Sequence, residues 1–463
     1  MENAQSVSRS LLVQLEVQGP APSASATPKS WQERALDIAT CALLVMVLLA
    51  PLMTYNELPL TGEGSAVRQV GYVLILGLAV FGARPAVTRW KLIGMPVPVL
   101  LALGWCWISV AWAIEPDIAL RRLFLTTVIV WTTFLIVQQA GYRSTLDIVR
   151  VVLVLALGAN FATVFLDPAT GIHMMKDSAV STALIGNWRG FLVHKNFAGA
   201  ACALTILLFL FDARKISPVL RVAVVLLAGY FLLRTQSKTS AGMAALALLA
   251  GLCFQFYSRR FRAYAIPSIA IVASLGWMVL SAYEDVLRFS YLAPSAFTGR
   301  GYIWNMLLKY AGDHLLTGAG FDSFWNIGAY SPVYQYGSGM LTQITVGHNG
   351  YLDLLVTIGL PGLILAVFCF VGWPLWRLLA NESIPVEQGA LITALIIFCM
   401  GHNVTESSLF SRDAFVGFFM ALATAFAQQA HRNKVRIGKR RSAGDDLMRS
   451  IRVRGRAERK AVA

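Results

Sequence analysis

The sequence is poor in charge for its length. Only 14% of its 463 residues are Asp, Glu, Lys or Arg, whereas 57% are hydrophobic and the mean hydropathy is +0.62. A soluble domain carries about a quarter charged residues. A chain this apolar cannot fold as a water-soluble globule, so we predict an integral membrane protein that uses lipid as part of its solvent.

Patterns for disulfides, metals and nucleotide phosphates are also missing. The six cysteines all fall in apolar segments and no two share a loop, which argues against a disulfide framework or a thiolate metal site. No Asp-x-Asp pair stands in a predicted outer loop, and no glycine-rich phosphate loop occurs. The sequence therefore disfavours a metal-dependent sugar transferase and an ATP-driven pump. We expect no metal and no cofactor.

Long apolar runs make up most of the chain, and crossing a bilayer takes about 20 apolar residues. The expected fold is all-α, with about 12 transmembrane helices within residues 36–430, a disordered cytoplasmic leader at 1–35 and a basic tail at 431–463. A re-entrant course also fits the seventh and eighth segments. The twelve segments are 36–54, 66–83, 95–113, 119–140, 148–166, 194–212, 218–234, 240–257, 264–282, 350–372, 387–402 and 411–429.

Basic residues are concentrated in alternate short loops and in the tail, where twelve of the 39 Lys and Arg lie between Arg432 and Lys460. The positive-inside rule then places both termini in the cytoplasm and the long loop 283–349 outside. The tail is interpreted as resting on anionic membrane lipid rather than binding nucleic acid.

The long outer loop has a helical pattern of its own. We predict a helix within 298–316, capped by Thr298 and with Arg300 in its first turn. An amphipathic helix of this kind would lie on the membrane surface with its apolar face down. The residues expected on that face are Ile303, Trp304, Leu307, Leu308, Ala311 and Leu315.

Polar residues recur at the predicted outer face, where they are costly unless they face a cavity or a ligand. His348 comes just before the helix at 350–372, and a neutral imidazole can accept a proton near physiological pH. Arg189, Lys195 and Lys238 stand outside, against the positive-inside trend. Since the arginine fork suits phosphate oxygens, these cations indicate binding of a phosphorylated lipid. For three other arginines we expect snorkelling from helix ends: Arg121, Arg122 and Arg234.

Several short motifs on this side occur in one order. They are Gly-Phe-Leu-Val-His-Lys-Asn at 190–196, Ser-Lys-Thr-Ser at 237–240, Thr-Gly-Arg at 298–300 with Trp304, Gly-Ala-Gly-Phe at 318–321, His-Asn-Gly-Tyr-Leu at 348–352 and the segment 403–406. Together they resemble the O-antigen ligase and exopolysaccharide polymerase superfamily, in particular its ExoQ-type polysaccharide production proteins. The resemblance covers about residues 36–430.

The resemblance implies metal-independent glycosyl transfer at the periplasmic face of a bacterial inner membrane. The donor would be a saccharide on undecaprenyl pyrophosphate and the acceptor a sugar hydroxyl. The family's catalytic base maps onto His348 and a pyrophosphate-binding arginine onto Arg300, while Lys238 stands where the family often has Arg. The expected substrate-binding residues are Arg189, Lys195, Asn196, Lys238, Trp304, Asn349, Tyr351 and Glu406.

The acceptor is left open by the sequence. A polymerase, which we favour, adds another lipid-linked repeat, whereas a ligase uses a lipid core or a protein hydroxyl. A transporter or flippase is the alternative from another class, and it would place charges along a path in mid-helix, where this chain has almost no acidic residues. Whether a chain-length regulator contacts the tail is also open.

Overall fold

The computed structural model describes residues 29–54, 65–84, 92–174, 184–269, 271–272, 276, 300–380, 384–411 and 414–430. Within these ranges the regular structure is helical, apart from one isolated bridge between Ile172 and Trp188. Six helices in this part of the chain are long and apolar enough to cross a membrane, and several shorter apolar helices accompany them. The chain is therefore a multi-pass membrane protein, as predicted.

The helices match the predicted segments closely. The long ones are α2 (Trp31–Thr54), α6 (Pro116–Ala140), α7 (Tyr142–Leu166), α10 (Pro218–Thr235), α11 (Lys238–Phe256) and the continuous run from α15 (Gly350–Val367) through a π-turn (Phe368–Gly372) into α16 (Trp373–Ala380). The shorter ones are α3 (Ala66–Gly82), α5 (Val97–Ser109), α9 (Lys195–Leu210), α17 (Val386–His402) and a helix at Phe415–Ala430.

Two predicted segments need comment. The expected helix at 350–372 was too short, since the chain continues as a helix to Ala380. Gly359, at a φ of 69°, and Pro361 interrupt its regular geometry. Most of the segment 264–282 lies outside the described residues, as do residues 1–28 of the expected leader and the whole tail. The expected end of the leader at residue 35 was wrong, since α2 already begins at Trp31.

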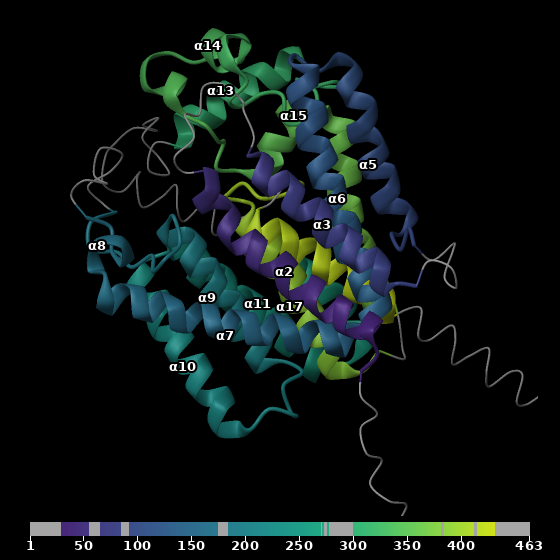
Figure 1. Ribbon diagram of the computed structural model, residues 1–463. Helices are drawn as coiled ribbons and strands as arrows, with labels where there is room; N and C mark the ends of the chain where they lie inside the picture. Colours follow the sequence, from purple (N-terminus) through teal and green to yellow (C-terminus); the bar gives the residue numbers. More distant parts are fainter. Residues whose placement is uncertain are drawn as a thin grey trace, which may run out of the picture.

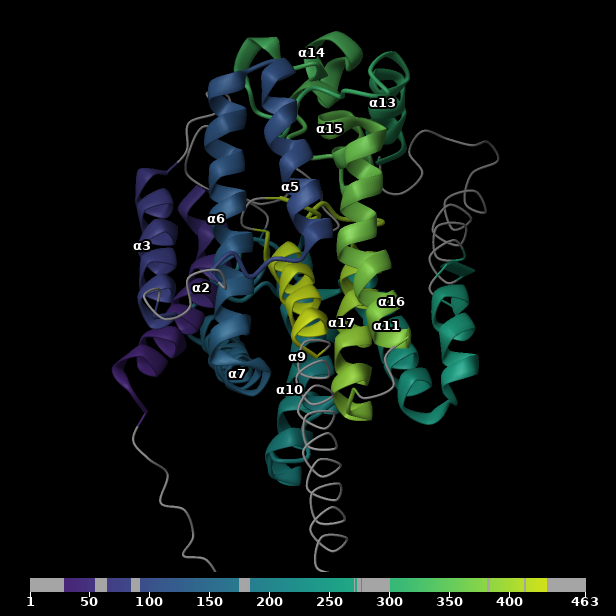
Figure 2. The same cartoon turned by 90° about the vertical axis from the view of Figure 1, so that its right-hand side faces the viewer.

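The centre of the bundle is formed by α17 and the helix Phe415–Ala430, whose side chains are buried almost throughout. On one side α9 and α11 pack against α17, with α10 outside α9 (Figure 1). On the other side α2, α3 and α6 pack together, and α5 packs against α15 (Figure 2). The outermost helices present apolar side chains outward, such as Val219, Leu226 and Leu233 of α10. Such a surface suits contact with lipid.

The connections alternate between two ends of the bundle. At one end, hydrogen bonds join helix ends and loops that are distant in the sequence: Ser144 to Asp37, Tyr142 to Asp212, and Gln428 to Gly94. At the other end the partners are Glu115 with Ser323, Asn196 with Glu406, and Thr239 with Thr405. The long helices named above run between these two ends (Figure 2).

A cap covers the second end of the bundle, at the top of Figure 1. It consists of α13 (Arg300–Asp313), short turns at Gly328–Tyr330 and Gly339–Gln343, and α14 (Val333–Tyr336). The predicted helix is confirmed, and Arg300 is in its first turn, whereas Thr298 lies outside the described residues. The expected apolar face was wrong at Leu308 and Leu315, which are exposed.

The buried face of α13 is turned toward protein. Ile303, Leu307 and Tyr310 form a small core with Phe324 of the cap and Val356 of α15. The helix is therefore held by its own core within the molecule, and its position does not depend on an apolar face turned toward lipid.

Arg122 of α6 fastens the cap to the bundle. Its guanidinium donates to the carbonyl oxygens of Asp322 (2.6 Å), Trp325 (2.9 Å) and Asn326 (2.9 Å). The side chain is 5% exposed, so the expected snorkelling was wrong here: the loop carbonyls replace water. Arg234, for which snorkelling was also expected, is exposed in the last turn of α10 and lies 5.0 Å over the ring of Trp188.

We expect Arg122→Lys to loosen the cap. Lysine keeps the charge but lacks the planar fork, so buried carbonyls lose their donors at a cost of about 3 kcal/mol. Thermal unfolding in detergent should show a clearly lower midpoint. Arg221→Lys on α10, remote from the cap, is the control and should leave the midpoint unchanged. An equal midpoint in Arg122→Lys and the wild type would show that the cap does not depend on this fork.

Candidate functional site

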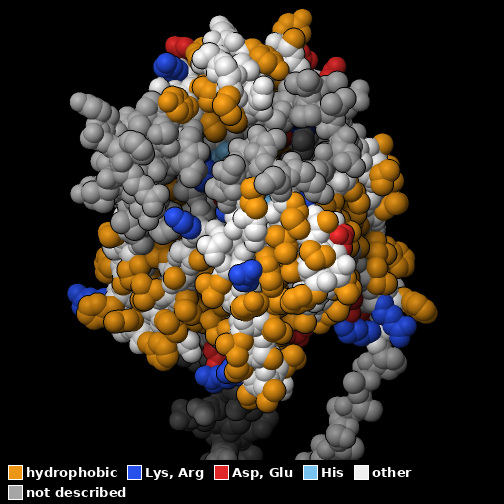
Figure 3. Space-filling model, turned by 90° about the vertical axis from the view of Figure 1, so that its left-hand side faces the viewer, with side chains coloured by type: hydrophobic (Ala, Val, Ile, Leu, Met, Phe, Trp, Pro, Cys, Tyr) orange, Lys and Arg blue, Asp and Glu red, His pale blue; other side chains and the backbone are white. Residues whose placement is uncertain are grey.

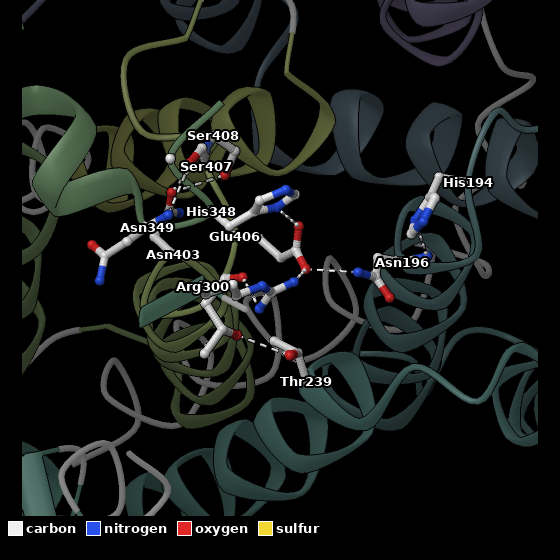
Figure 4. A network of polar contacts seen from close by, with 12 residues as sticks. His194, Asn196, Thr239, Arg300, His348, Asn349, Asn403, Glu406, Ser407 and Ser408 are labelled. Atoms are coloured by element: carbon white, nitrogen blue, oxygen red, sulfur yellow. Dashed lines mark hydrogen bonds and ion pairs between the residues drawn. The ribbon is translucent and has the colours of Figure 1, made fainter. Parts of the chain in front are cut away.

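Polar residues gather beneath the cap, where four parts of the chain meet. These are the start of α13, the loop that ends at His348, the start of α9, and the link from α17 to the helix Phe415–Ala430 (Figure 4). The space-filling view shows basic and histidine side chains inside a recess between the cap and the bundle (Figure 3). The lower part of the same face is predominantly apolar, so the recess lies at the edge of the lipid-facing zone.

Glu406 is the common partner in this site. Its Oε1 accepts from Arg300 Nη2 (2.8 Å) and from Asn196 Nδ2 (2.6 Å). Its other oxygen, Oε2, lies 3.6 Å from His348 Nδ1. Arg300 also donates to the Thr405 carbonyl (2.6 Å), so the guanidinium is fixed at two points. The side chain of Glu406 is 16% exposed and that of His348 is 35% exposed, which leaves the imidazole accessible.

Glu406 is held in its charged form. Burial raises the pKa of its carboxyl, but contact with the His348 ring and the charge of Arg300 outweigh this and lower the pKa to about 2. A permanent carboxylate therefore faces the imidazole at neutral pH. A carboxylate in this position stabilises the protonated ring and orients the neutral one.

Short-range contacts of the backbone fix the place of His348. It adopts a left-handed φ of 50°, which turns the chain sharply before α15. On one side the Trp304 indole donates to the Gly347 carbonyl (3.0 Å). On the other side Asn349 caps α15 by accepting from two backbone N–H groups. The imidazole is thus held between two anchored residues.

The link after α17 is bonded directly to the start of α15. The Gly350 N–H donates to the carbonyls of Asn403 (2.9 Å) and Glu406 (3.0 Å). A Cβ at Gly350 would come within 2.2 Å of Asn403 Oδ1, so this close approach requires glycine. Asn403 is fully buried and its Oδ1 accepts from the backbone N–H of Ser408 (2.9 Å). These bonds hold Glu406 opposite His348.

Two histidines shape the start of α9. His194 Nδ1 accepts the N–H of Asn196 (3.2 Å), and His173 Nε2 accepts the N–H of Lys195 (3.3 Å). Burial lowers the pKa of His194 to about 4, so the ring is neutral at pH 7 and keeps the lone pair that this bond needs. The caps direct Asn196 toward Glu406.

The start of α11 brings a further cation. Ser237 and Ser240 are buried and hydrogen-bonded to each other (3.0 Å), and a Cβ at Gly199 of α9 would meet Ser237 at 2.7 Å. The two helices are therefore in close contact, and the exposed Lys238 lies within electrostatic reach of Lys195. The cations expected from the motifs thus border the cluster around Glu406.

Other expected residues take part differently. Asn349 and Trp304 support the backbone beside His348, as described above. The Tyr351 hydroxyl donates to the Met400 carbonyl (2.8 Å), and Arg189 Nε donates to the Thr170 carbonyl (2.8 Å). Both of these bonds lead away from Glu406, so neither residue is joined to the cluster by them.

The sequence reading missed Asn403 as a positioning residue and Asp353 as a partner of the loop. Asp353 accepts from the Trp325 indole (2.9 Å) and from the Gly347 N–H (3.3 Å). Its signal was weak, since an acidic residue in a first helical turn is ordinary. In the part of the chain that the structure describes, no three His, Cys, Asp or Glu side chains are grouped to hold a metal ion.

Fold and site together define a multi-pass helical membrane protein with a basic, histidine-containing site at one end of its bundle. The family model described as O-Antigen ligase (Wzy_C) matches residues 222–367, a stretch that contains Lys238, Arg300 and His348. The exopolysaccharide production protein ExoQ of Rhizobium meliloti (strain 1021) is 24% identical over 314 residues, which cover 63% of this chain and 68% of ExoQ. The resemblance seen in the sequence is confirmed: the chain carries the O-antigen ligase region and is a distant relative of ExoQ. O-antigen ligases and the related polymerases are glycosyl-transferring enzymes.

The depressed pKa of Glu406 predicts an acid-dependent stability. Its charged form stabilises the fold fully above the ordinary value of 4.5, and this contribution is lost as the pH falls toward about 2. The difference in thermal midpoint between wild type and Glu406→Gln should therefore be constant from pH 7 to about 5 and shrink from pH 4.5 to pH 3.

Glu387→Gln, at the opposite end of the bundle, serves as the matched control. A Glu406→Gln difference that is the same at pH 3 as at pH 7 would contradict the charged cluster.

Proposed function

We propose that this protein is a polymerase that joins undecaprenyl-pyrophosphate-linked oligosaccharide repeats into exopolysaccharide. The observation that carries the proposal is the pairing of His348 Nδ1 with Glu406 Oε2 beside Arg300, at the edge of an apolar bundle. A charged leaving group and a lipid tail would meet in this place. The match to the O-antigen ligase family and the relation to ExoQ support the reaction class.

His348 is the proposed general base. A carboxylate facing Nδ1 favours the tautomer with the proton on Nδ1, and Nε2 then carries the lone pair. In the transfer, the acceptor hydroxyl oxygen bonds to the anomeric carbon of the donor while its proton passes to His348 Nε2. The bond from that carbon to the pyrophosphate oxygen breaks, and undecaprenyl pyrophosphate leaves.

Arg300, Lys195 and Lys238 are proposed to bind the pyrophosphate. Arg300 uses one N–H on Glu406 and one on the Thr405 carbonyl, and its other N–H donors can bind phosphate oxygens. Because pyrophosphate already activates the sugar, the protein needs chiefly to position both substrates and to stabilise the charge on the departing phosphate. No metal takes part in this scheme.

The proposed topology follows from the same site. A lipid-linked donor of this kind presents its saccharide outside the inner membrane, so the cap and the loop 283–349 face the periplasm. The alternate end, with its basic loops and both termini, then faces the cytoplasm, and the chain crosses about twelve times. The buried Arg122 and Arg150 bond to backbone carbonyls near one end of their helices, an arrangement that does not favour a transport path.

Ligation is the second candidate, because the matching family model is described as O-Antigen ligase. The acceptor would then be a lipid core or a protein hydroxyl, with the same donor chemistry. A deletion strain separates the two: a polymerase defect accumulates single lipid-linked repeats, whereas a ligase defect leaves long polymer on its lipid carrier.

We expect His348→Ala to abolish polymer formation in that deletion strain. Loss of a general base typically lowers a rate by about 10²–10⁴-fold. Gel profiles of extracellular and lipid-linked saccharide, at equal amounts of protein in the membrane, measure the effect. His314→Ala is the matched control, since His314 is exposed on the cap and stacks only on Tyr310. Normal polymer in His348→Ala would remove this residue from the mechanism.

At position 238 we expect the positive charge to matter more for donor binding than the planar guanidinium that an arginine would provide. Lys238→Gln should raise the KM for the lipid-linked donor about tenfold, which corresponds to about 1.4 kcal/mol, whereas Lys238→Arg should keep it within about twofold of the wild type. The assay is polymerisation by the purified protein in liposomes at varied donor concentration. A Lys238→Gln protein with the wild-type KM would show that this cation does not bind the donor.

A further inference from the structure

A second space, lined by both polar and apolar side chains, lies beside the site, next to the cap and the start of α15. It is a cavity of about 160 Å³. Its lining comes from four parts of the chain: Arg122 of α6, the cap loop 321–326, residues 345–357 before and within α15, and the link 407–411. Since a water molecule takes about 30 Å³ in the liquid, this space has room for about five waters or one six-membered sugar ring. The scheme above does not use it.

The lining suits hydroxyl groups. Asp353 presents a carboxylate that accepts from the Trp325 indole, the Gly347 N–H and the Ser407 hydroxyl, which leaves it a further acceptor position, and Ser411 presents a hydroxyl. Trp325 adds an aromatic surface, and Asn326 adds a side-chain amide. A carboxylate, an amide, hydroxyls and an indole together offer donors, acceptors and a flat apolar face, as a polyhydroxylated ring requires.

The cavity and the basic cluster lie on opposite sides of the same short stretch of chain. Val346 and Gly350, on either side of His348, line the cavity, while His348 turns Nδ1 toward Glu406. In the link between α17 and the helix Phe415–Ala430, Glu406 bonds to Arg300 of the basic cluster, whereas the next residue, Ser407, lines the cavity. Figure 4 shows this division, with Arg300 and Asn196 on one side of His348 and Asn349 and the two serines on the other.

We propose that this cavity binds the terminal sugar ring of the acceptor saccharide. The inference rests on the proposed transferase function and assigns the acceptor to the α15 side of His348, opposite the donor pyrophosphate. Asp353 and Asp322 in the lining disfavour phosphate, and a prenyl tail would leave these carboxylates without hydrogen-bond partners from the occupant. Arg122 does not change this, because its guanidinium is engaged by loop carbonyls.

Thr345 gives access to the cavity without disturbing the core. It is exposed, lies in an extended stretch and lines the cavity, whereas Gln343 is exposed on the same loop but does not line it. With the repeat oligosaccharide cleaved from its lipid carrier as the acceptor, Thr345→Trp should raise the KM for this acceptor at least about tenfold and leave the KM for the lipid-linked donor within about twofold. Gln343→Trp should change neither. Equal acceptor KM values in Thr345→Trp and the wild type would overturn the subsite.

A labelling test reports on binding without turnover. Thr345→Cys, in a Cys41→Ser background because Cys41 is the exposed cysteine among the described residues, is treated with a membrane-impermeant thiol reagent. The probe is the repeat oligosaccharide cleaved from its lipid carrier, with undecaprenyl pyrophosphate alone for comparison. The oligosaccharide should slow labelling at position 345 at least about threefold, while Gln343→Cys should label at an unchanged rate.

The outcomes separate the two proposals. Protection of residue 345 by the oligosaccharide supports a saccharide subsite even if the wild type makes no polymer, in which case the polymerase proposal fails alone. Unchanged labelling at position 345 in a protein that polymerises normally overturns the subsite and leaves the polymerase proposal standing. Protection by undecaprenyl pyrophosphate alone would assign the cavity to the donor and also overturn the inference.

Discussion

The carboxylate of Glu406 is the interaction on which the site depends. It joins Arg300 of the cap, Asn196 of α9 and His348 of the loop before α15, which are distant from one another in the sequence. Each of these groups would be costly to bury alone, and the shared carboxylate compensates all three. Because Glu406 stays ionised well below neutral pH, the arrangement is permanent under ordinary conditions.

The rest of the fold serves to bring these segments to one end of an apolar bundle. The nearly fully buried α17 carries the link with Glu406, and α9 and α11 pack closely on it. Arg122 fixes the cap to α6, and the core of α13 rests on α15. The site is therefore built where the lipid-facing surface ends, a position that allows one substrate to keep its tail in the membrane and its polar head in the recess.

The helices could be predicted from the sequence because crossing a bilayer demands long apolar runs, and those runs are visible one by one. His348, Arg300 and Asn196 were found through their motifs, and Glu406 was named only as one binding residue among several. Its role as the common partner depends on how three distant segments meet, which no local pattern records. The exposed positions of Leu308 and Leu315 and the clamp formed by Arg122 were missed for the same reason, since both depend on what the cap packs against.

The most direct test of the account is the turnover of Glu406→Gln in liposomes that contain the purified protein and a lipid-linked oligosaccharide repeat. Glutamine keeps the shape of the side chain but removes the charge that orients His348 and holds Arg300. The account predicts that kcat falls at least about 100-fold while the protein remains folded at neutral pH. A Glu406→Gln protein that polymerises at the wild-type rate would contradict it.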